Sequence, residues 1–382
     1  MCGNKVKSGV PYVCPVKEST PGFDHFYSRG KTVIAQGLLE GALEPSPELA
    51  EVLFSCTLCG NCMTQCGSMD QDTGEVLVDT TEIVEAMRAD FLENYPQWIN
   101  PAYQSILNST RQYNNPWGLP RTAKEKWAKK MQLKNARKEP APVLLYTGCT
   151  MPSSQSLSSR ARKAAEILSR ADVDFAILGK DEPCCGSVQK RIGDRKLSDE
   201  MMEENIELFN SLGCETIVTL CAGCANMLKN DYGQAKTELK PRVLHIVEFL
   251  PKLITEEKIQ FKKEHPLKVA YHDPCHLGRH MGVYNQPRTI LNNLPGVELI
   301  ERAATRENTI CCGAGGGMRI FESGKIAEKI GEAAVVSAIH AGAEALVTAC
   351  PFCEMNLEAA AGNQDTQIPV YDIVDLLYET LT

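Results

Sequence analysis

The sequence has no apolar run long enough to cross a bilayer, no basic domain and no apolar segment near its N-terminus. Its most apolar stretch, residues 333–350, is interrupted by Ser337, His340 and Glu344, so no membrane-spanning helix is predicted. The formal net charge of −8 and the lack of a basic domain argue against a nucleic-acid partner. Because residues 1–18 lack the apolar core of a secretory signal, we expect a cytoplasmic protein.

Several common catalytic motifs are also missing. The sequence shows no phosphate-binding P-loop, no Ser-His-Asp arrangement and no pair of catalytic carboxylates. No strand-linked glycine fingerprint is followed by the acidic residue that a dinucleotide site needs. The chain therefore carries no recognisable flavin or nicotinamide site. Its 382 residues are enough for two or three domains.

Cysteine is what the sequence has in excess, with 17 residues. The thiols of a cytosolic protein stay reduced and an odd number cannot all pair, so a disulfide framework is not predicted. Metal binding is the remaining explanation, and the spacing of the cysteines decides which metal. Cys2 and Cys214 stand outside the patterns described below; we expect neither to be a ligand and interpret Cys214 as a core residue.

The first group of cysteines has the C-x-x-C-x-x-C-x-x-x-C spacing of a [4Fe–4S] ferredoxin motif and consists of Cys56, Cys59, Cys62 and Cys66. In two-cluster ferredoxins the fourth cysteine of one motif is followed by proline and serves the other cluster. Cys14, which precedes a proline, looks like the end of a second motif whose other cysteines are absent. We predict that Cys14 completes the cluster of Cys56, Cys59 and Cys62. The alternative is that Cys66 is the fourth ligand.

Helical patterns surround this group. Residues 30–41 and 48–54 carry apolar side chains at helical spacing, and Thr80 or Thr81 can cap a third helix that extends to Phe91. Residues 1–95 are therefore expected to form a helical ferredoxin-like domain with one cubane [4Fe–4S] cluster.

Residues 96–140 contain all three tryptophans and a basic run from Lys124 to Lys138. One interpretation is a docking surface for a redox partner. The interpretation we favour is a connecting segment that packs over the domain junction and leaves its lysines in solvent.

The rest of the chain is duplicated. Residues 142–149 match 267–275, residues 183–186 match 310–313, and residues 216–224 match 345–353, with an offset of 126 to 129 throughout. In each copy, short strand-like runs end at cysteines and alternate with helical patterns, which is typical of parallel α/β units. The expected fold is therefore an α+β and α/β multidomain protein: the helical domain, then tandem α/β repeats at 141–264 and 265–382.

Each repeat has five cysteines in the order C, CC, CxxC. They lie in loops after strands, at the edge where parallel sheets bind ligands, so we expect five sulfurs to converge in each repeat. Zinc needs only four ligands, and a vicinal cysteine pair chelates one ion awkwardly. Five thiolates fit a larger iron–sulfur assembly better. The two sets, here called the first and second quintets, are Cys149, Cys184, Cys185, Cys221 and Cys224, and Cys275, Cys311, Cys312, Cys350 and Cys353.

Other residues near the second quintet have more than one interpretation. His272, His276 and His280 flank Cys275 and are either proton donors to product thiolates or satisfied core histidines. Arg279 and Arg319 are candidates for binding an anionic group of a substrate.

The duplicated cysteine pattern resembles the paired cysteine-rich "CCG" domains of heterodisulfide reductase. Nearly the whole chain is similar to the family of its catalytic HdrD subunit, in which a helical ferredoxin domain is fused to two such domains. The resemblance implies one noncubane [4Fe–4S] cluster on each quintet. It also implies that the clusters reduce a disulfide. We expect the vicinal cysteines Cys184, Cys185, Cys311 and Cys312 to be catalytic, together with His272 and His276.

This resemblance defines the expected function and partners. The substrate would be a small disulfide, such as the heterodisulfide CoM-S-S-CoB, and the electrons would come from a partner subunit that is a flavoprotein, a ferredoxin or a membrane cytochrome. Such a partner would place the protein at the inner face of the membrane. The segment from Tyr271 to Arg279 also recurs in iron–sulfur subunits of lactate, glycolate and glycerol-3-phosphate oxidising complexes. The alternative function is therefore electron transfer from a flavoprotein dehydrogenase to a membrane or quinone partner.

Overall fold

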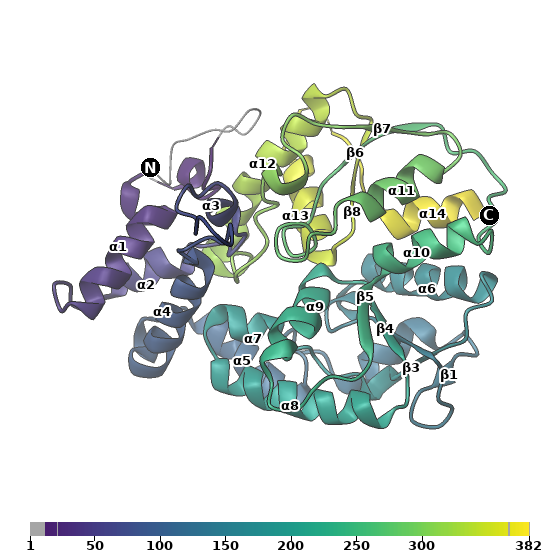
Figure 1. The fold of residues 1–382 in the computed structure, drawn as a ribbon, viewed down its shortest axis with the longest axis horizontal. Helices are drawn as coiled ribbons and strands as arrows, with labels where there is room; N and C mark the ends of the chain where they lie inside the picture. Colours follow the sequence, from purple (N-terminus) through teal and green to yellow (C-terminus); the bar gives the residue numbers. More distant parts are fainter. Residues whose placement is uncertain (1–11, 21, 366, 382) are drawn as a thin grey trace.

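The structure is a computed structural model that describes residues 12–20, 22–365 and 367–381. Figure 1 shows a helical N-terminal part beside two α/β units, which lie one above the other in this view. Cys2 lies outside the described residues, and the 16 cysteines within them are all free thiols.

The N-terminal part is built from helices that enclose the first cysteine group: α1 (Ser28–Leu39), α2 (Pro47–Phe54), the short α3 (Asn61–Thr64) and α4 (Thr80–Asn94). Ser46 caps α2 by accepting a hydrogen bond from the backbone N–H of Leu49. The prediction that Thr80 or Thr81 caps α4 is wrong. Asp79 is the cap, because its carboxylate accepts the backbone N–H of Glu82 and both threonines lie within the first turn.

The segment expected to connect the domains is more than a linker. It forms α5 (Pro101–Tyr113), a 3-10 helix (Arg121–Ala128) and β1 (Lys134–Asn135), which pairs in parallel with a strand of the first repeat. The boundary expected at residue 141 places β1 in the connecting segment, whereas β1 belongs to the sheet of the first repeat. Lys124, at the start of the basic run, is buried and donates to the carbonyl oxygens of Asn114 and Glu182.

The first repeat is a parallel five-stranded sheet in the order β1-β3-β2-β4-β5, covered by helices. The predicted strand 143–146 is confirmed residue for residue, and its four side chains are buried. The elements after β1 are β2 (Val143–Tyr146), α6 (Gln155–Arg170), β3 (Phe175–Ile177), α7 (Ser187–Ile192), α8 (Arg195–Ser211), β4 (Thr216–Thr219), α9 (Ala222–Asn226), β5 (Arg242–His245) and α10 (Ile246–Thr255).

The second repeat is a parallel four-stranded sheet in the order β7-β6-β8-β9, the same order as the last four strands of the first sheet. The duplication seen in the sequence is therefore a duplication of topology. Its elements are β6 (Leu267–Tyr271), α11 (Asn285–Asn293), β7 (Val297–Ile300), α12 (Lys325–His340), β8 (Ala345–Thr348), α13 (Pro351–Gly362), β9 (Val370–Asp372) and α14 (Ile373–Leu381).

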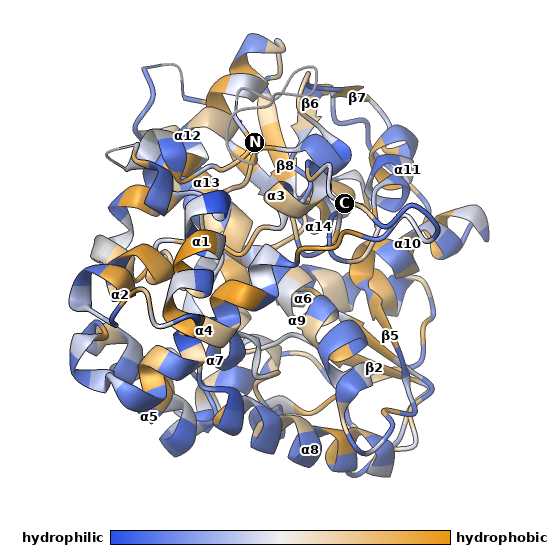
Figure 2. Ribbon diagram, turned by 60° about the vertical axis from the view of Figure 1, so that its left-hand side comes forward, coloured by the Kyte–Doolittle hydropathy of each residue, from blue (hydrophilic) through white to orange (hydrophobic). Residues whose placement is uncertain are grey.

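The two repeats share one hydrophobic core. Buried residues of α6 and β2 in the first repeat belong to the same cluster as residues of β6, α12 and α14 in the second. Figure 2 shows the strands as hydrophobic segments beneath helices with mixed surfaces. A buried ionic contact crosses the junction, since Arg160 of α6 donates to Asp375 of α14 at 2.7 Å and pairs with Glu354 of α13. These contacts hold the cysteine loops of the two repeats in a fixed relation.

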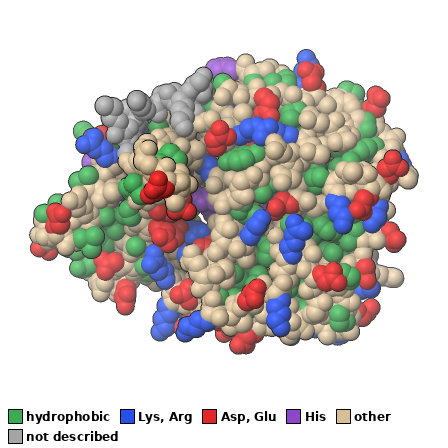
Figure 3. All heavy atoms as spheres, viewed as in Figure 1, with side chains coloured by type: hydrophobic (Ala, Val, Ile, Leu, Met, Phe, Trp, Pro, Cys, Tyr) green, Lys and Arg blue, Asp and Glu red, His purple; other side chains and the backbone are tan. Residues whose placement is uncertain are grey.

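The surface of the N-terminal part is acidic and partly apolar. Residues 22–95 contain 13 Asp and Glu but only three Lys and Arg. The large apolar side chains that are exposed in the described part of the chain all lie here: Phe23, Val33, Leu39, Leu43, Met69 and Leu77. Figure 3 shows hydrophobic and acidic side chains interspersed on this face. Within the described residues, no helix combines the length and apolar character needed to span a bilayer.

Candidate metal centres

Parallel strands deliver the cysteines of each repeat to one edge of its sheet. Cys149 follows β2 and Cys221 follows β4, just as Cys275 follows β6 and Cys350 follows β8. The vicinal pairs lie in the loops that leave β3 and β7. Because the carboxyl ends of parallel strands meet at one edge, loops far apart in the sequence become neighbours.

The first quintet is buried and compact. The Sγ atoms of Cys149 and Cys184 are 3.7 Å apart, and those of Cys185 and Cys224 are 3.4 Å apart. Cys221 contacts Cys224 through its thiol. Gly148 has a φ of +79°, and a Cβ placed there would lie 3.1 Å from the sulfur of Cys224. A glycine is therefore needed where the backbone passes this close to the sulfurs.

The second quintet has the same arrangement. Cys311 contacts both Cys275 and Cys312, while Cys353 contacts Cys312 and Cys350. Backbone N–H groups point at two of the sulfurs, from Gly313 to Cys311 at 3.3 Å and from Ala314 to Cys312 at 3.5 Å. Donors of this kind stabilise thiolates and bound metal clusters. The structure thus brings together all ten cysteines that the sequence assigned to two sites.

Thiol contacts also join the three groups to one another. The thiol of Cys59 in the N-terminal group contacts that of Cys311, and the thiol of Cys350 contacts that of Cys221 across the two repeats. An unbroken series of thiol contacts results, running through Cys59, Cys311, Cys312, Cys353, Cys350, Cys221, Cys224, Cys185, Cys184 and Cys149. The second repeat lies between the N-terminal group and the first repeat in this series.

The N-terminal group places Cys14 and Cys66 differently. Cys14 lines one small cavity together with Cys56, Cys59 and Cys62. Burial is the largest cause that raises the pKa of Cys14, to about 11, and the neighbouring Cys56 and Cys59 act in the same direction. Cys66 does not line this cavity, and its sulfur faces the backbone N–H of Ser68 at 3.4 Å. The arrangement favours Cys14 over Cys66 as the fourth ligand.

A pair of serine variants distinguishes these two cysteines. In Cys14→Ser the N-terminal cluster is expected to be lost or converted to a three-iron form, because one of four thiolates is removed. Cys66→Ser is the matched control and should keep an intact four-iron cluster. Electron paramagnetic resonance (EPR) of anaerobically purified, reduced protein measures both. A cluster that survives Cys14→Ser but not Cys66→Ser would reverse the assignment.

A buried cation next to the sulfurs of the N-terminal group indicates whether this site suits an anionic iron–sulfur cluster. Lys31 is 1% exposed, and its ammonium group donates to the carbonyl of Phe26 and to Ser55. No described side chain provides a carboxylate that pairs with it; its opposite charges come from Cys56, Cys14 and Cys62. An unpaired ammonium is costly to bury, so a compensating negative charge is expected at these sulfurs. Thiolates bound to iron supply that charge, and the residues therefore fit the group.

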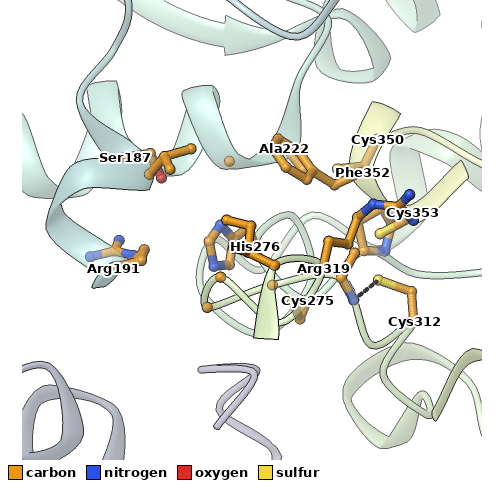
Figure 4. A pocket seen from close by; sticks show the side chains of 18 of the residues that line it. Ser187, Arg191, Ala222, Cys275, His276, Cys312, Arg319, Cys350, Phe352 and Cys353 are labelled. Atoms are coloured by element: carbon orange, nitrogen blue, oxygen red, sulfur yellow. Dashed lines mark hydrogen bonds between the residues drawn. The ribbon is translucent and has the colours of Figure 1, made fainter. Parts of the chain in front are cut away.

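A cavity lies between the repeats and joins both halves of the site. Figure 4 shows Ser187, Arg191 and Ala222 of the first repeat facing Cys275, His276 and Arg319 of the second. The lining is mostly apolar and includes Trp117, Val188, Ile320 and Phe352. Cys275, Cys312, Cys350 and Cys353 reach the cavity wall, whereas the first quintet lies behind Ala222 and Gly223.

The predicted catalytic residues are distributed unevenly around this cavity. Cys312 and His276 line it, whereas Cys184, Cys185, Cys311 and His272 do not. Burial, with a contribution from His280, lowers the pKa of His276 to about 3, so its imidazole is neutral near pH 7. A neutral ring can donate one N–H but does not carry a spare proton.

The two candidate arginines also differ. Arg279 is occupied in the fold, because its guanidinium donates to the carbonyls of Cys59, Glu307 and Thr309. Arg319 lines the cavity and donates to Asn356 at 3.0 Å. Only Arg319 of this pair is therefore placed to meet an anion in the cavity.

Sequence reasoning missed three residues near the sites. Trp117 comes from the segment expected to be a connector and packs against Phe352 in a tilted arrangement, with ring centroids 5.9 Å apart. Arg191 lines the cavity and is held by Glu85 and Asp231. Arg88 of α4 is fully buried and bonds to all three parts of the chain. No local pattern identified them, since each acts through partners distant in sequence.

Comparisons with known proteins agree with this architecture. The chain matches the family described as "Cysteine-rich domain" (CCG) twice, at residues 143–229 and 269–358. It is 34% identical over 353 residues to the HdrD subunit of the dihydromethanophenazine:CoB–CoM heterodisulfide reductase of Methanosarcina barkeri, and the match covers 90% of this chain and 82% of that protein. The corresponding protein of Methanosarcina acetivorans is 33% identical, with coverage of 92% and 82%.

Other relatives are larger proteins. The chain is 29% identical to the EtfAB:quinone oxidoreductase of Syntrophomonas wolfei and covers 47% of that protein's length, compared with 87% of its own. Among solved structures, a hypothetical protein from Helicobacter pylori aligns with a TM-score of 0.58 at 10% identity, covering 96% of this chain and 70% of the other. At that identity the likeness concerns the fold alone.

Two duplicated α/β repeats, each with a quintet of converging cysteines, agree with these matches along nearly the whole chain. The mixed α/β fold with two CCG domains is confirmed. The chain therefore belongs to the HdrD family of heterodisulfide reductase subunits, whose members are iron–sulfur electron-transfer oxidoreductases.

Proposed function

We propose that this chain is the disulfide-reducing subunit of a redox complex. In this proposal a cubane [4Fe–4S] cluster is held by Cys14, Cys56, Cys59 and Cys62, and each quintet holds one noncubane [4Fe–4S] cluster. The observation that carries the proposal is the series of thiol contacts from Cys59 through both quintets. Such a series provides a route for electrons from the N-terminal part to the cavity between the repeats.

The reaction would be the reduction of a disulfide, RSSR′, by two electrons and two protons to RSH and R′SH. Bound iron–sulfur clusters supply one-electron transfers, so two of them, one at the cavity wall and one behind Ala222 and Gly223, match the two-electron demand of the bond. The apolar wall of Trp117 and Phe352 would exclude water from the S–S bond. Arg319 would orient an acidic group of the substrate, and the neutral ring of His276 would donate an N–H hydrogen bond to a product thiolate, while the two protons would come from water.

The electrons would come from a partner subunit. The chain has no flavin or nicotinamide motif, and the named relatives include a heterodisulfide reductase subunit and an EtfAB:quinone oxidoreductase. A flavoprotein, a ferredoxin or a membrane cytochrome would each meet this requirement. The substrate that the first relatives' names favour is the heterodisulfide of CoM and CoB.

A second candidate function is electron transfer without disulfide chemistry. The observation that favours it is the match to the EtfAB:quinone oxidoreductase, although the chain spans about half of that relative's length. In this case the first quintet would pass electrons to a second partner rather than to a disulfide.

One experiment separates the two functions. Protein purified anaerobically is expected to hold about 12 irons per chain, which corresponds to three clusters of four. With a reduced viologen as donor, it should reduce CoM-S-S-CoB or another small asymmetric disulfide. Full iron content with no reduction of any disulfide, together with rapid transfer to a quinone or flavoprotein acceptor, would contradict the proposal and support electron transfer alone.

A further inference from the structure

The two repeats differ at one position beside their sulfurs. Tyr271 pairs with Val347 in the second sheet, and Leu145 pairs with Val218 at the same register in the first. The next residue is His272 in the second repeat but Tyr146 in the first, and each lies three positions before a cysteine. The duplication thus places an imidazole where its copy has a phenol.

His272 faces the sulfurs of the second quintet. A ring nitrogen and the Sγ atoms of Cys312 and Cys353 all lie within 4.8 Å of one another. The side chain is 1% exposed, and its contact with Cys312 has hydrogen-bond character. Its Nδ1 is buried and has no hydrogen-bond partner among the described residues. A buried imidazole nitrogen without a partner is unusual and points to a missing ligand or metal.

Tyr146 plays a different part in the first repeat. Its hydroxyl donates to the carbonyl oxygen of Pro183 at 2.7 Å, so the phenol is satisfied by the backbone. The ring packs beside Cys185 and Cys224 without offering them a nitrogen. The first quintet therefore has sulfur ligands alone, whereas the second has sulfur and one nitrogen.

We propose that His272 is a nitrogen ligand of the cluster on the second quintet and makes that cluster chemically distinct from the one on the first. This inference rests on the proposed function, because it assumes iron at both quintets. A neutral imidazole adds less negative charge to iron than a thiolate, and histidine ligation raises the reduction potential of iron–sulfur centres. The second cluster, which touches the N-terminal group, then accepts electrons more readily than the first.

The experiment compares the whole protein with two exchanges between the repeats. In full-length protein reduced by one electron, pulsed EPR should detect a histidine nitrogen coupled to the cluster with the strength of an iron-bound imidazole. Labelling with 15N-histidine should change this coupling as expected when 14N is replaced by 15N. The coupling should be lost in His272→Tyr and kept in His276→Gln, which alters a neighbouring ring. Tyr146→His should add a second coupling at the first quintet.

Redox titration gives an independent measurement. His272→Tyr should lower the reduction potential of one cluster. At a fixed ambient potential the ratio of reduced to oxidised cluster should fall at least about tenfold, and for a one-electron step this fall corresponds to a shift of 59 mV in the potential. Native protein needs no variant for the labelling experiment, so a His272→Tyr chain that loses its cluster leaves that test intact.

The outcomes separate this inference from the proposed function. Native protein that holds full iron and reduces a disulfide, but shows no histidine coupling or only the weak coupling of a hydrogen-bonded ring, would overturn the ligand assignment alone. Native protein that shows the strong coupling but reduces no disulfide would support the ligand and refute the catalytic proposal.

Discussion

Cys184→Ser and Cys311→Ser are each expected to abolish disulfide reduction rather than halve it. The two residues belong to different quintets, and the proposed reaction needs one electron from each cluster at the same bond. We expect a loss of at least about 100-fold in each variant, because residues that only hold a metal ligand in place are already worth 10–100-fold. The rate of disulfide reduction with reduced viologen measures the effect.

Spectroscopy should show that the losses have different origins. Cys184→Ser should keep the clusters of the N-terminal group and the second quintet, because the sulfurs that its side chain contacts belong to its own quintet. Cys311→Ser should perturb the second quintet and its contact with Cys59. Iron analysis and EPR of each variant report which cluster is affected.

Cys214→Ser is the matched control for both variants. Cys214 is half-buried and belongs to neither quintet, so its replacement should leave iron content and turnover within error of the native protein. Full activity in Cys184→Ser or in Cys311→Ser would contradict a mechanism that uses both clusters. Half activity in each would indicate two independent sites instead of one shared cavity.

Much of the fold could be predicted because the sequence contains the same α/β repeat twice. Strands such as 143–146 consist of β-branched, aliphatic and aromatic residues and are followed closely by a cysteine, and a second copy of the pattern repeats this arrangement. The short edge strand β1 was missed, since two residues carry no periodic signal and its pairing with β3 depends on tertiary contacts. The Asp79 cap was missed because three adjacent residues are all capable of capping α4.

The cysteines of the candidate sites could be predicted from their spacing, but the other residues of the sites could not. Both quintets and the N-terminal group come together as expected, because strand ends converge in any parallel sheet. The order of the three groups was not predictable, since Cys59 meets Cys311 only through the packing of whole domains. The roles of Trp117 and Arg191 in the cavity could not be predicted either, because their neighbours there are far away in sequence.

Arg88 explains how these groups are held in contact. Its guanidinium donates to the carbonyls of Leu53 and Cys56 in the N-terminal part, at 2.9 Å and 2.7 Å. It also donates to the carbonyl of Arg191 in the first repeat at 2.7 Å and to that of Gly316 in the second at 2.8 Å. One buried cation thus binds all three parts of the chain. At Gly316, with a φ of +60°, a Cβ would lie 2.4 Å from the carbonyl oxygen of Cys56, so only glycine allows this approach.

Arg88→Leu is expected to lower the free energy of unfolding by several kcal/mol, because each buried carbonyl left without its donor costs about 1–3 kcal/mol. Leucine would leave four buried carbonyls without their donor. The loop of Cys56 would also lose its anchor to the second repeat, so electron transfer from the N-terminal cluster should slow more than direct reduction of the second quintet by viologen. Anaerobic denaturant unfolding and freeze-quench EPR measure the two effects.

Two further variants provide comparisons for the stability of Arg88→Leu. Arg88→Lys keeps the charge but cannot reach four carbonyls from one ammonium, so we expect an intermediate loss of stability. Arg111→Leu removes a half-exposed arginine that bonds to Asp194, and an exposed pair of this kind contributes only about 0–1 kcal/mol. If Arg88→Leu unfolds no more easily than Arg111→Leu, then Arg88 does not hold the three parts together. The contact between Cys59 and Cys311 would then depend on the apolar packing of Leu58, Tyr103 and Met318 around it.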